Sequence, residues 1–295
     1  MNQPHPPPPQ PRVLLASAGL HAKKSWGQNF LENTEILNEI ALLAGAAPDK
    51  KIIELGSGLG ALTYYLLING ASVIAIERDR EIVPLLRNVL AWAQERLEIL
   101  EADAASLNYF ALADQLKTKL TVAGNLPYQL SSRILVSLAD AGSVINQAVL
   151  LVQREVAERL VSPPGSRIYG LLSVLVQRRF TATIARIVPP GAFFPRPKVH
   201  SAIVVLKVQP QQRSAQADES LVQVARAAFS HRRKMLRSAL ALVWHIDAAL
   251  LEPVFAEANI KPTVRAEELG LDEFAYLGML LQKHKILPSK IRGCP

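Results

Sequence analysis

The tetrapeptide Asn125-Leu126-Pro127-Tyr128 has the most specific chemistry in the chain. The side-chain oxygen of Asn125 and the backbone carbonyl of Leu126 can accept the two N–H groups of an aromatic amine. Such a nitrogen is a poor nucleophile because its lone pair is delocalised, and two acceptors would push it toward tetrahedral geometry. Pro127 stiffens the turn, and Tyr128 offers a ring face for stacking a base. These residues predict a site for a planar amino group; alone, they would also suit a turn with a buried tyrosine.

A glycine-rich turn, Glu-x-Gly-x-Gly-x-Gly at residues 54–60, is the second chemical signature. It follows a predicted strand and precedes a predicted helix, and alternate glycines such as Gly56 and Gly58 let the backbone approach a ligand closely. The next predicted strand ends in Glu77, whose carboxylate can accept hydrogen bonds from both hydroxyls of a ribose. Together these features predict a nucleoside site, with an ordinary tight turn as the alternative.

The glycine spacing indicates which nucleoside is bound. Nicotinamide dinucleotides usually go with Gly-x-Gly-x-x-Gly, whereas the pattern here resembles the first motif of class I methyltransferases. The tetrapeptide resembles the (Asn/Asp)-(Pro/Leu)-Pro-Tyr motif of enzymes that methylate planar amino nitrogens. These resemblances imply S-adenosyl-L-methionine as the cofactor, and its sulfonium makes a strong general base unnecessary. Asp103, after the third predicted strand, is placed to accept from the cofactor's adenine amine or to cap the following helical turn.

A second aromatic residue, Phe193, precedes Pro195 and Pro197, which make a stiff and extended loop. Such a loop can hold Phe193 against the face of the base opposite to Tyr128. The alternative is a loop anchored in the core by Phe193 and Phe194.

The elements that must position these residues alternate between strands and helices. Short runs rich in Val, Ile and Leu are typical of buried strands, and helical patterns lie between the earlier runs. We expect an α/β fold with a mostly parallel seven-stranded sheet, helices on both faces and an antiparallel last pair. The predicted helices are Ala61–Asn69, Arg80–Glu95 and Ser131–Ala141. The predicted strands are Lys51–Leu55, Ser72–Ile76, Leu97–Leu100, Leu120–Ala123, Ala148–Val152, Thr181–Val188 and Ser201–Val208.

Composition divides the chain into four parts. Residues 1–21 are proline-rich, and we expect a disordered tail because this composition suits neither a helix nor a sheet. Residues 22–208 form the predicted cofactor-binding domain, and residues 209–218 form a polar linker. Residues 219–295 are predicted to be a small all-helical domain that binds RNA, with a break near Lys261-Pro262.

Cations gather in the predicted helix around residues 225–240. Arg226, Arg233 and Arg237 recur at helical spacing and should share a face, separate from an apolar stripe used for packing. Arginine is well suited to phosphate contacts, so this face is predicted to bind RNA, with a merely solvated face as the alternative. The predicted RNA-binding residues are Arg226, Arg232, Arg233, Lys234 and Arg237.

Whole-chain composition narrows the class of protein. The 295 residues carry a formal net charge of +8, which favours a polyanionic partner such as nucleic acid. The single cysteine, Cys294, excludes an intramolecular disulfide and a cysteine-based metal site, and we expect no metal. No secretory signal or membrane-length apolar run is present, so we expect a cytoplasmic location without membrane contact.

The motifs together are similar to those of the ribosomal RNA small-subunit (16S) adenine dimethyltransferases, over roughly residues 22–239. The resemblance implies that two adjacent adenosines, in a hairpin near the 3′ end of that RNA, each receive two methyl groups at N6. It assigns cofactor contacts to Asn29 and Leu31, in a segment that closes over the cofactor, and to further matching positions. Those positions are Gly56, Glu77, Asp103 and Asn125, and Gly58 joins them from the glycine turn. The segments that carry the resemblance are residues 23–31, 53–63, 125–128, 153–160, 169–174, 193–201 and 229–234.

The implied partner is small-subunit rRNA or the immature small ribosomal subunit, with the protein acting as a monomer in ribosome biogenesis. Two alternatives remain. One is a methyltransferase of the antibiotic-resistance type that modifies large-subunit rRNA and shares the catalytic motifs. The other is an assembly or binding factor that is largely non-catalytic.

Overall fold

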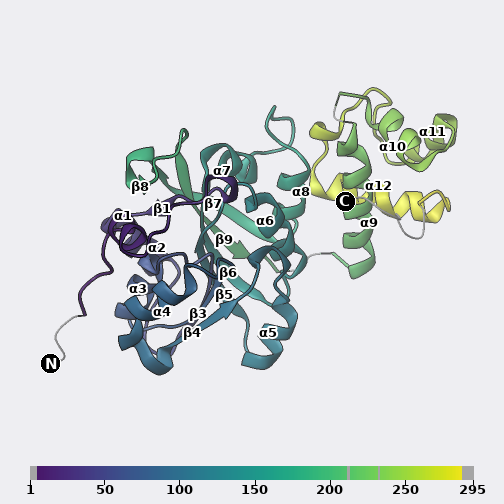
Figure 1. The fold of residues 1–295 in the computed structure, drawn as a ribbon. Helices are drawn as coiled ribbons and strands as arrows, with labels where there is room; N and C mark the ends of the chain where they lie inside the picture. The colour runs from purple at the N-terminus through teal and green to yellow at the C-terminus, as the bar shows by residue number, and fades with distance from the viewer. Residues whose placement is uncertain (1–4, 211–212, 232, 288–295) are drawn as a thin grey trace. The chain divides into compact units, whose positions relative to one another are not determined.

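The chain folds into two compact units in a computed structural model that describes residues 5–210, 213–231 and 233–287 (Figure 1). The first unit contains the described residues up to Ala157 together with Phe180–Val208, and the second contains Glu158–Arg179 and the described residues from Gln209 onward. The first unit ends at Val208, which is also the last residue of the predicted cofactor-binding domain. The assignment of Glu158–Arg179 to the cofactor-binding domain is wrong, because buried residues such as Tyr169 and Val174 join the core of the second unit.

The sheet of the first unit has seven strands in the order β4-β3-β2-β5-β6-β9-β7. Neighbours from β4 to β6 are parallel, whereas β9 is antiparallel to both β6 and β7, so the predicted strands and pairing are confirmed. The order reverses direction at the β2–β5 pair, which opens a crevice outside the carboxyl ends of these strands. The strands are β2 (Lys51–Leu55), β3 (Ser72–Glu77), β4 (Leu97–Glu101), β5 (Leu120–Asn125), β6 (Ile145–Gln153), β7 (Phe180–Val188) and β9 (Ser201–Val208).

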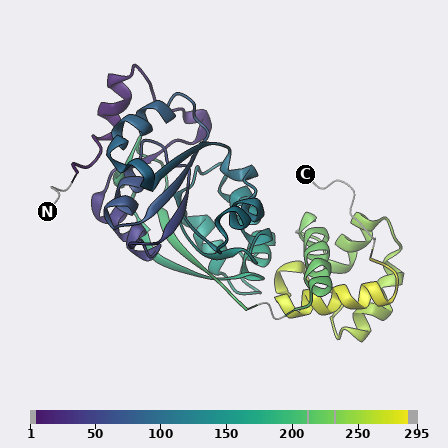
Figure 2. The same cartoon turned by 90° about the horizontal axis from the view of Figure 1, so that it is seen from below.

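Helices cover both faces of this sheet (Figures 1 and 2). On one face lie α2 (Thr34–Leu43), α3 (Ala61–Ile68) and α4 (Val83–Val89), and α5 (Tyr109–Leu116) and α6 (Ser131–Asp140) lie on the other. The core under α2 and α3 consists mostly of aliphatic side chains from both helices and from the strands.

The predicted helix Arg80–Glu95 is shorter in the structure. Pro84 stands in the first turn of α4, the position at which a helix tolerates proline. A separate 3₁₀ helix, Ala91–Arg96, follows α4, and Gln94 within it has a φ of 46°. The α-helix is therefore shorter than predicted: it begins just before Pro84 and ends before Gln94, whose φ is positive.

The predicted disorder of residues 1–21 is wrong for α1 (Pro11–Ser17). Pro11 occupies the first position of that helix, where its missing N–H costs nothing. Leu14 and Leu15 are buried against Leu59 and Ile82, so tertiary burial stabilises the helix.

A two-stranded sheet that the sequence did not predict pairs β1 (Phe30–Leu31) with β8 (Phe193–Phe194). Both strands have only two residues, which is too short for a periodic signal. This pairing ties the segment before α2 to the loop that precedes β9.

The second unit is entirely helical in its described part. Its long helices α9 and α12 cross each other, green and yellow in Figure 2. A Cβ on Gly278 would lie 2.7 Å from the Cβ of Ser220, so glycine is required where these helices meet. The helices are α7 (Arg154–Val161, which begins in the first unit), α8 (Leu171–Gln177), α9 (Ala215–Ser230), α10 (Leu236–Trp244), α11 (Glu252–Glu257) and α12 (Leu271–Lys283).

Two predictions about this region need correction. The linker ends before residue 218, because the Ser214 side chain caps α9 by accepting from the N–H of Ala217. The predicted helix over residues 225–240 is interrupted between α9 and α10. In the described ranges, no helix has the length and apolar character that crossing a bilayer requires.

A buried ion cluster joins α8 to α9. The carboxylate of Asp218, 8 % exposed, accepts from Arg178 at 2.6 Å and from Arg179 at 2.7 Å. Removing one member of a buried cluster leaves the other charges unpaired in a medium that solvates them poorly.

We therefore expect Asp218→Ala to lower the free energy of unfolding by about 3–5 kcal/mol, measured by urea denaturation followed by circular dichroism. The matched control is Asp114→Ala, because the Asp114–Lys117 pair is exposed and should contribute at most about 1 kcal/mol. Equal losses for the two variants would contradict the structural role of the cluster.

Candidate cofactor and substrate site

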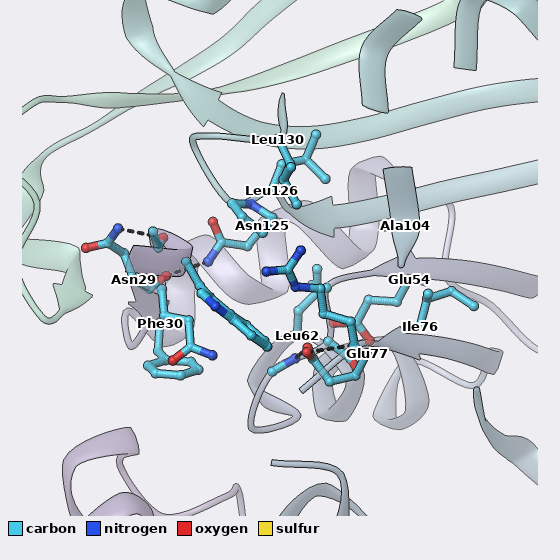
Figure 3. Close-up of a pocket in the computed structure, with 18 of the residues that line it drawn as sticks. Asn29, Phe30, Glu54, Leu62, Ile76, Glu77, Ala104, Asn125, Leu126 and Leu130 are labelled. Atoms are coloured by element: carbon cyan, nitrogen blue, oxygen red, sulfur yellow. Dashed lines mark hydrogen bonds between the residues drawn. The ribbon is translucent and has the colours of Figure 1, made fainter. Parts of the chain in front are cut away.

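A pocket opens at the carboxyl ends of β2, β3 and β5, where the strand order reverses (Figure 3). It lies within the first unit. The structure brings together at this pocket every residue that the sequence predicted for the cofactor, and the whole tetrapeptide. These residues are Asn29, Leu31, Gly56, Gly58, Glu77, Asp103, Asn125, Leu126, Pro127 and Tyr128.

The glycine turn gives the pocket its floor. Gly58 has a φ of 53°, and a Cβ there would lie 3.2 Å from the ring of Phe30, so a side chain would be both strained and crowded. The N–H of Gly58 donates to Oε2 of Glu77 at 2.8 Å. The turn is therefore held against the end of β3 by the same carboxylate that faces the pocket.

Glu77 is 7 % exposed and accepts three backbone hydrogen bonds. Besides Gly58, the N–H groups of Arg78 and Asp79 donate to Oε1 at 2.9 and 2.8 Å. Burial raises the pKa of Glu77, and the three backbone donors oppose that rise by favouring the charged form. The side chain is thus fixed in one orientation, as a ribose acceptor must be.

Two further polar groups line the pocket and were not predicted as ligand contacts. Ser57 Oγ is buried without a hydrogen-bond partner among the described residues, so it is free to bond to a polar ligand. Glu54, 1 % exposed, accepts from Thr63 Oγ1 at 2.6 Å. Burial raises the pKa of Glu54 to about 8, so the carboxyl group holds its proton near neutral pH.

Asp103 serves as a helix cap, which was the alternative prediction for this residue. Its Oδ1 accepts from the N–H of Ala105 at 2.9 Å, and its Oδ2 lies 3.8 Å from the Arg78 guanidinium. Because Asp103 also lines the pocket, capping leaves it placed beside a ligand.

The tip of β5 presents acceptors to the pocket. Asn125 Nδ2 donates to the backbone oxygen of Asn29 at 2.8 Å, which turns Oδ1 of Asn125 away from that partner (Figure 3). The N–H of Leu126 donates to Leu151 at 3.0 Å, and the carbonyl of Pro127 accepts from Leu130. Within the described part of the chain, no hydrogen bond occupies the carbonyl oxygen of Leu126.

Tyr128 is anchored at both ends. Its hydroxyl lies 2.7 Å from Ser201 Oγ, and its backbone oxygen accepts from Ser131 Oγ at 3.0 Å. Burial raises the pKa of Tyr128, so the phenol stays neutral. Phe193, which was predicted to stack on the base, is 4 % exposed, belongs to the core and does not line the pocket, as the alternative of a core-anchored loop predicts.

Several pocket residues escaped the sequence prediction. Trp26, Gln28 and Phe30 line the pocket from the segment before α2, and Arg78 lines it from the turn after β3. The motif at residues 23–31 predicts a segment that covers the cofactor, but it does not indicate which of its side chains face the pocket. Arg78 lies outside that motif.

The predicted RNA-binding residues are divided between two helices and a turn. Arg226 lies on α9, Arg237 lies on α10, and Arg233 and Lys234 are exposed in the turn between them. Arg237 pairs with Glu252 at 2.5 Å. The prediction of a single arginine face is therefore wrong, and Arg232 and Cys294 lie outside the described residues.

The raised pKa of Glu54 predicts a pH-dependent stability. The folded chain keeps this proton up to about pH 8, whereas the unfolded chain releases it near 4.5, so stability falls as pH rises between these values. We expect the stability of Glu54→Gln relative to the unmodified protein to increase by on the order of 3 kcal/mol from pH 5 to pH 8. Denaturant titrations across this range measure it. Exposed Glu98→Gln is the control, and an E54Q curve parallel to the unmodified one would refute the assignment.

Comparisons with known proteins identify the family of the chain. Residues 19–276 match the family model described as ribosomal RNA adenine dimethylase. Ribosomal RNA small subunit methyltransferase A of Anaeromyxobacter sp. (strain K) is 46 % identical over 277 residues, which cover 91 % of this chain and 96 % of that protein. The protein of the same name from Magnetococcus marinus is 40 % identical over 267 residues, covering 90 % of this chain and 94 % of that one.

Solved structures share the fold. A dimethyladenosine transferase from Plasmodium falciparum superposes with a TM-score of 0.71 at 24 % identity, covering 87 % of this chain and 98 % of that chain. The 23S rRNA methyltransferase ErmE gives a TM-score of 0.63 at 23 % identity, covering 86 % and 99 %. At these identities the likeness concerns the architecture, whereas the family model and the curated relatives cover the site as well. The chain therefore belongs to the ribosomal RNA adenine dimethylase family.

Proposed function

We propose that this protein transfers methyl groups from S-adenosyl-L-methionine to N6 of two adjacent adenosines near the 3′ end of small-subunit (16S) rRNA. The observation that carries the proposal is the pair of acceptors at the tip of β5, Oδ1 of Asn125 and the carbonyl of Leu126, beside the anchored ring of Tyr128. Two acceptors and a stacking face are what an adenine amino group requires.

The pocket residues fit the cofactor. Glu77 would accept from the ribose hydroxyls, Asp103 would accept from the adenine amine, and the buried Ser57 hydroxyl supplies a further polar contact. Gly56 and Gly58 leave the backbone bare where the nucleoside lies closest. The acids and glycines suit an uncharged ribose and an adenine better than they suit a pyrophosphate.

The chain's own residues prepare the substrate nitrogen. When bound, the cofactor supplies an electrophilic methyl group on a sulfonium, which is a good leaving group. Asn125 and Leu126 each accept one N–H of adenine N6, which draws the lone pair out of conjugation and directs it into the pocket. Tyr128 stacks on the extruded base and fixes its plane. The acceleration comes from positioning and electrostatics.

The substrate is small-subunit rRNA, as the names of the relatives at 40–46 % identity state for those proteins. We place the reaction in the cytoplasm, on the immature small ribosomal subunit, with the protein acting as a monomer. Arg226, Arg233 and Lys234 would contact RNA phosphates, and Arg232 belongs to the same cationic segment. Labelled methyl transfer to undermethylated small subunits, followed by nucleoside analysis for N6-dimethyladenosine, tests the proposal, and large-subunit rRNA is the competing substrate.

Asn125→Ala removes one of the two acceptors. We expect methyl transfer to fall by roughly 100-fold or more, because the nitrogen is no longer oriented or polarised. The measurement is the labelled-methyl assay on undermethylated small subunits. The control is Asn88→Ala on the exposed side of α4, which should keep full activity. An N125A enzyme with normal turnover would show that Asn125 does not act on the substrate nitrogen.

Arg233→Glu tests the RNA surface. We expect it to leave cofactor affinity unchanged and to reduce methylation about tenfold at physiological salt, with a shallower salt dependence of RNA binding. The control is Lys51→Glu, at the amino end of β2 and thus at the end of that strand opposite to the glycine turn. If R233E methylated normally at physiological salt, this turn would not belong to the RNA-binding surface.

A further inference from the structure

The segment at residues 22–31 passes over the cofactor pocket, and both of its ends are fastened. Upstream, Leu14 of α1 packs on Leu59 and Ile82 of the first unit. Downstream, β1 pairs with β8. Between these anchors, residues 26–31 line the pocket continuously. A ligand in the pocket is therefore covered by this segment.

Two donors of the segment bind one buried carboxylate. Asp79 is 1 % exposed, and its Oδ1 accepts from Lys23 Nζ at 2.8 Å while its Oδ2 accepts from Gln28 Nε2 at 2.8 Å. The Lys23 ammonium also pairs with Glu81, and Gln28 accepts from the backbone N–H of Lys23 at 2.7 Å. Hydrogen bonds to Asp79 and Glu81 raise the pKa of Lys23, so its charge persists at neutral pH.

An aromatic contact closes the segment at a second point. The Arg78 guanidinium lies 4.0 Å from the ring centroid of Trp26, and Lys23 Nζ lies 4.7 Å from the same ring. Both Trp26 and Arg78 line the pocket, and Arg78 also lies 3.8 Å from Asp103. A cation over an indole face is attracted by the ring quadrupole, and a planar guanidinium can stack as well.

We propose that Lys23, Trp26 and Arg78 are positioning residues that hold this segment closed over the cofactor and set the rate at which the used cofactor leaves. We call them, together with Asp79, the latch. Opening would leave the buried Asp79 carboxylate without its lysine and glutamine partners, which costs more than separating an exposed ion pair. The proposal rests on the proposed function, because it assumes that the pocket holds the cofactor.

The latch matters because one RNA consumes several cofactor molecules. Two methyl groups on each of two adenosines require four cofactor molecules, so used cofactor must leave the pocket four times for each fully methylated RNA. In many enzymes whose active site is closed by a lid, opening of the lid limits turnover. A tight latch retains the methyl donor, and a loose latch exchanges it faster.

The test measures dissociation of S-adenosylhomocysteine from the full-length protein by stopped-flow chase, with tryptophan fluorescence as the signal. We expect Lys23→Met and Arg78→Gln each to release this product about tenfold faster, a difference of about 1.4 kcal/mol, because affinity changes appear mainly in dissociation. Lys23→Arg should restore slow release because it keeps the charge. Arg78→Lys should not, because it loses the planar group that stacks on Trp26.

The control is Lys117→Met, which breaks the exposed ion pair between Lys117 and Asp114, residues that do not line the pocket. Its release rate should equal that of the unmodified protein. The latch would be overturned if folded K23M and R78Q released S-adenosylhomocysteine at the unmodified rate. It would also be overturned if K23R released it as fast as K23M. Failure of the unmodified protein to bind S-adenosylhomocysteine at all would instead overturn the proposed function.

Discussion

Burial of the Glu77 carboxylate is the constraint on which the rest of the site depends. A carboxylate that is 7 % exposed must find donors, and the chain supplies three backbone N–H groups from two different turns. One of these turns is the glycine loop after β2, and the other is the start of the β3–α4 connection. The acid therefore joins two turns into one floor before any ligand binds. The need for a bare backbone at Gly58 follows from the same packing, because Phe30 lies against that position.

Parallel pairing then decides what can meet at this floor. Since the carboxyl ends of β2, β3 and β5 lie along one edge, residues far apart in sequence converge there without any local signal that links them. Asn125 ends β5, and its amide is oriented by the backbone of Asn29, which belongs to the covering segment. The acceptor proposed to face the substrate is thus held by a segment that lines the same pocket. One hydrogen bond therefore links the proposed cover of the cofactor to the proposed acceptor of the substrate amine, and the tetrapeptide alone is an incomplete description of the site.

What the sequence could predict follows from the range of the interactions involved. The seven strands of the large sheet can be predicted because they are apolar runs. The parallel topology that those runs imply then predicts that the acids and glycines at their carboxyl ends lie together. The position of Phe193 could not be decided from the sequence, because a phenylalanine before a stiff loop has the same local pattern whether its ring faces a base or the core. In the structure β8 pairs with β1 and the ring is buried. The interrupted arginine helix shows the same limit, since its amphipathic stripe continues across a turn. Ser57 and Trp26 could not be predicted as pocket residues, because the burial of a hydroxyl and the direction of an indole ring depend on the assembled pocket.

The position of the latch has a further consequence for how the pocket works. Asp79 binds the covering segment, and its backbone N–H donates to Glu77, so the lid and the ribose contact share one short turn. Arg78 lies between them and donates its own N–H to the same carboxylate while its guanidinium rests on Trp26. If the latch acts as proposed, movement of the covering segment would pull on the turn that fixes Glu77. The group proposed to bind the ribose and the groups proposed to hold the covering segment are adjacent in the chain, so we expect retention and release of the cofactor to be coupled.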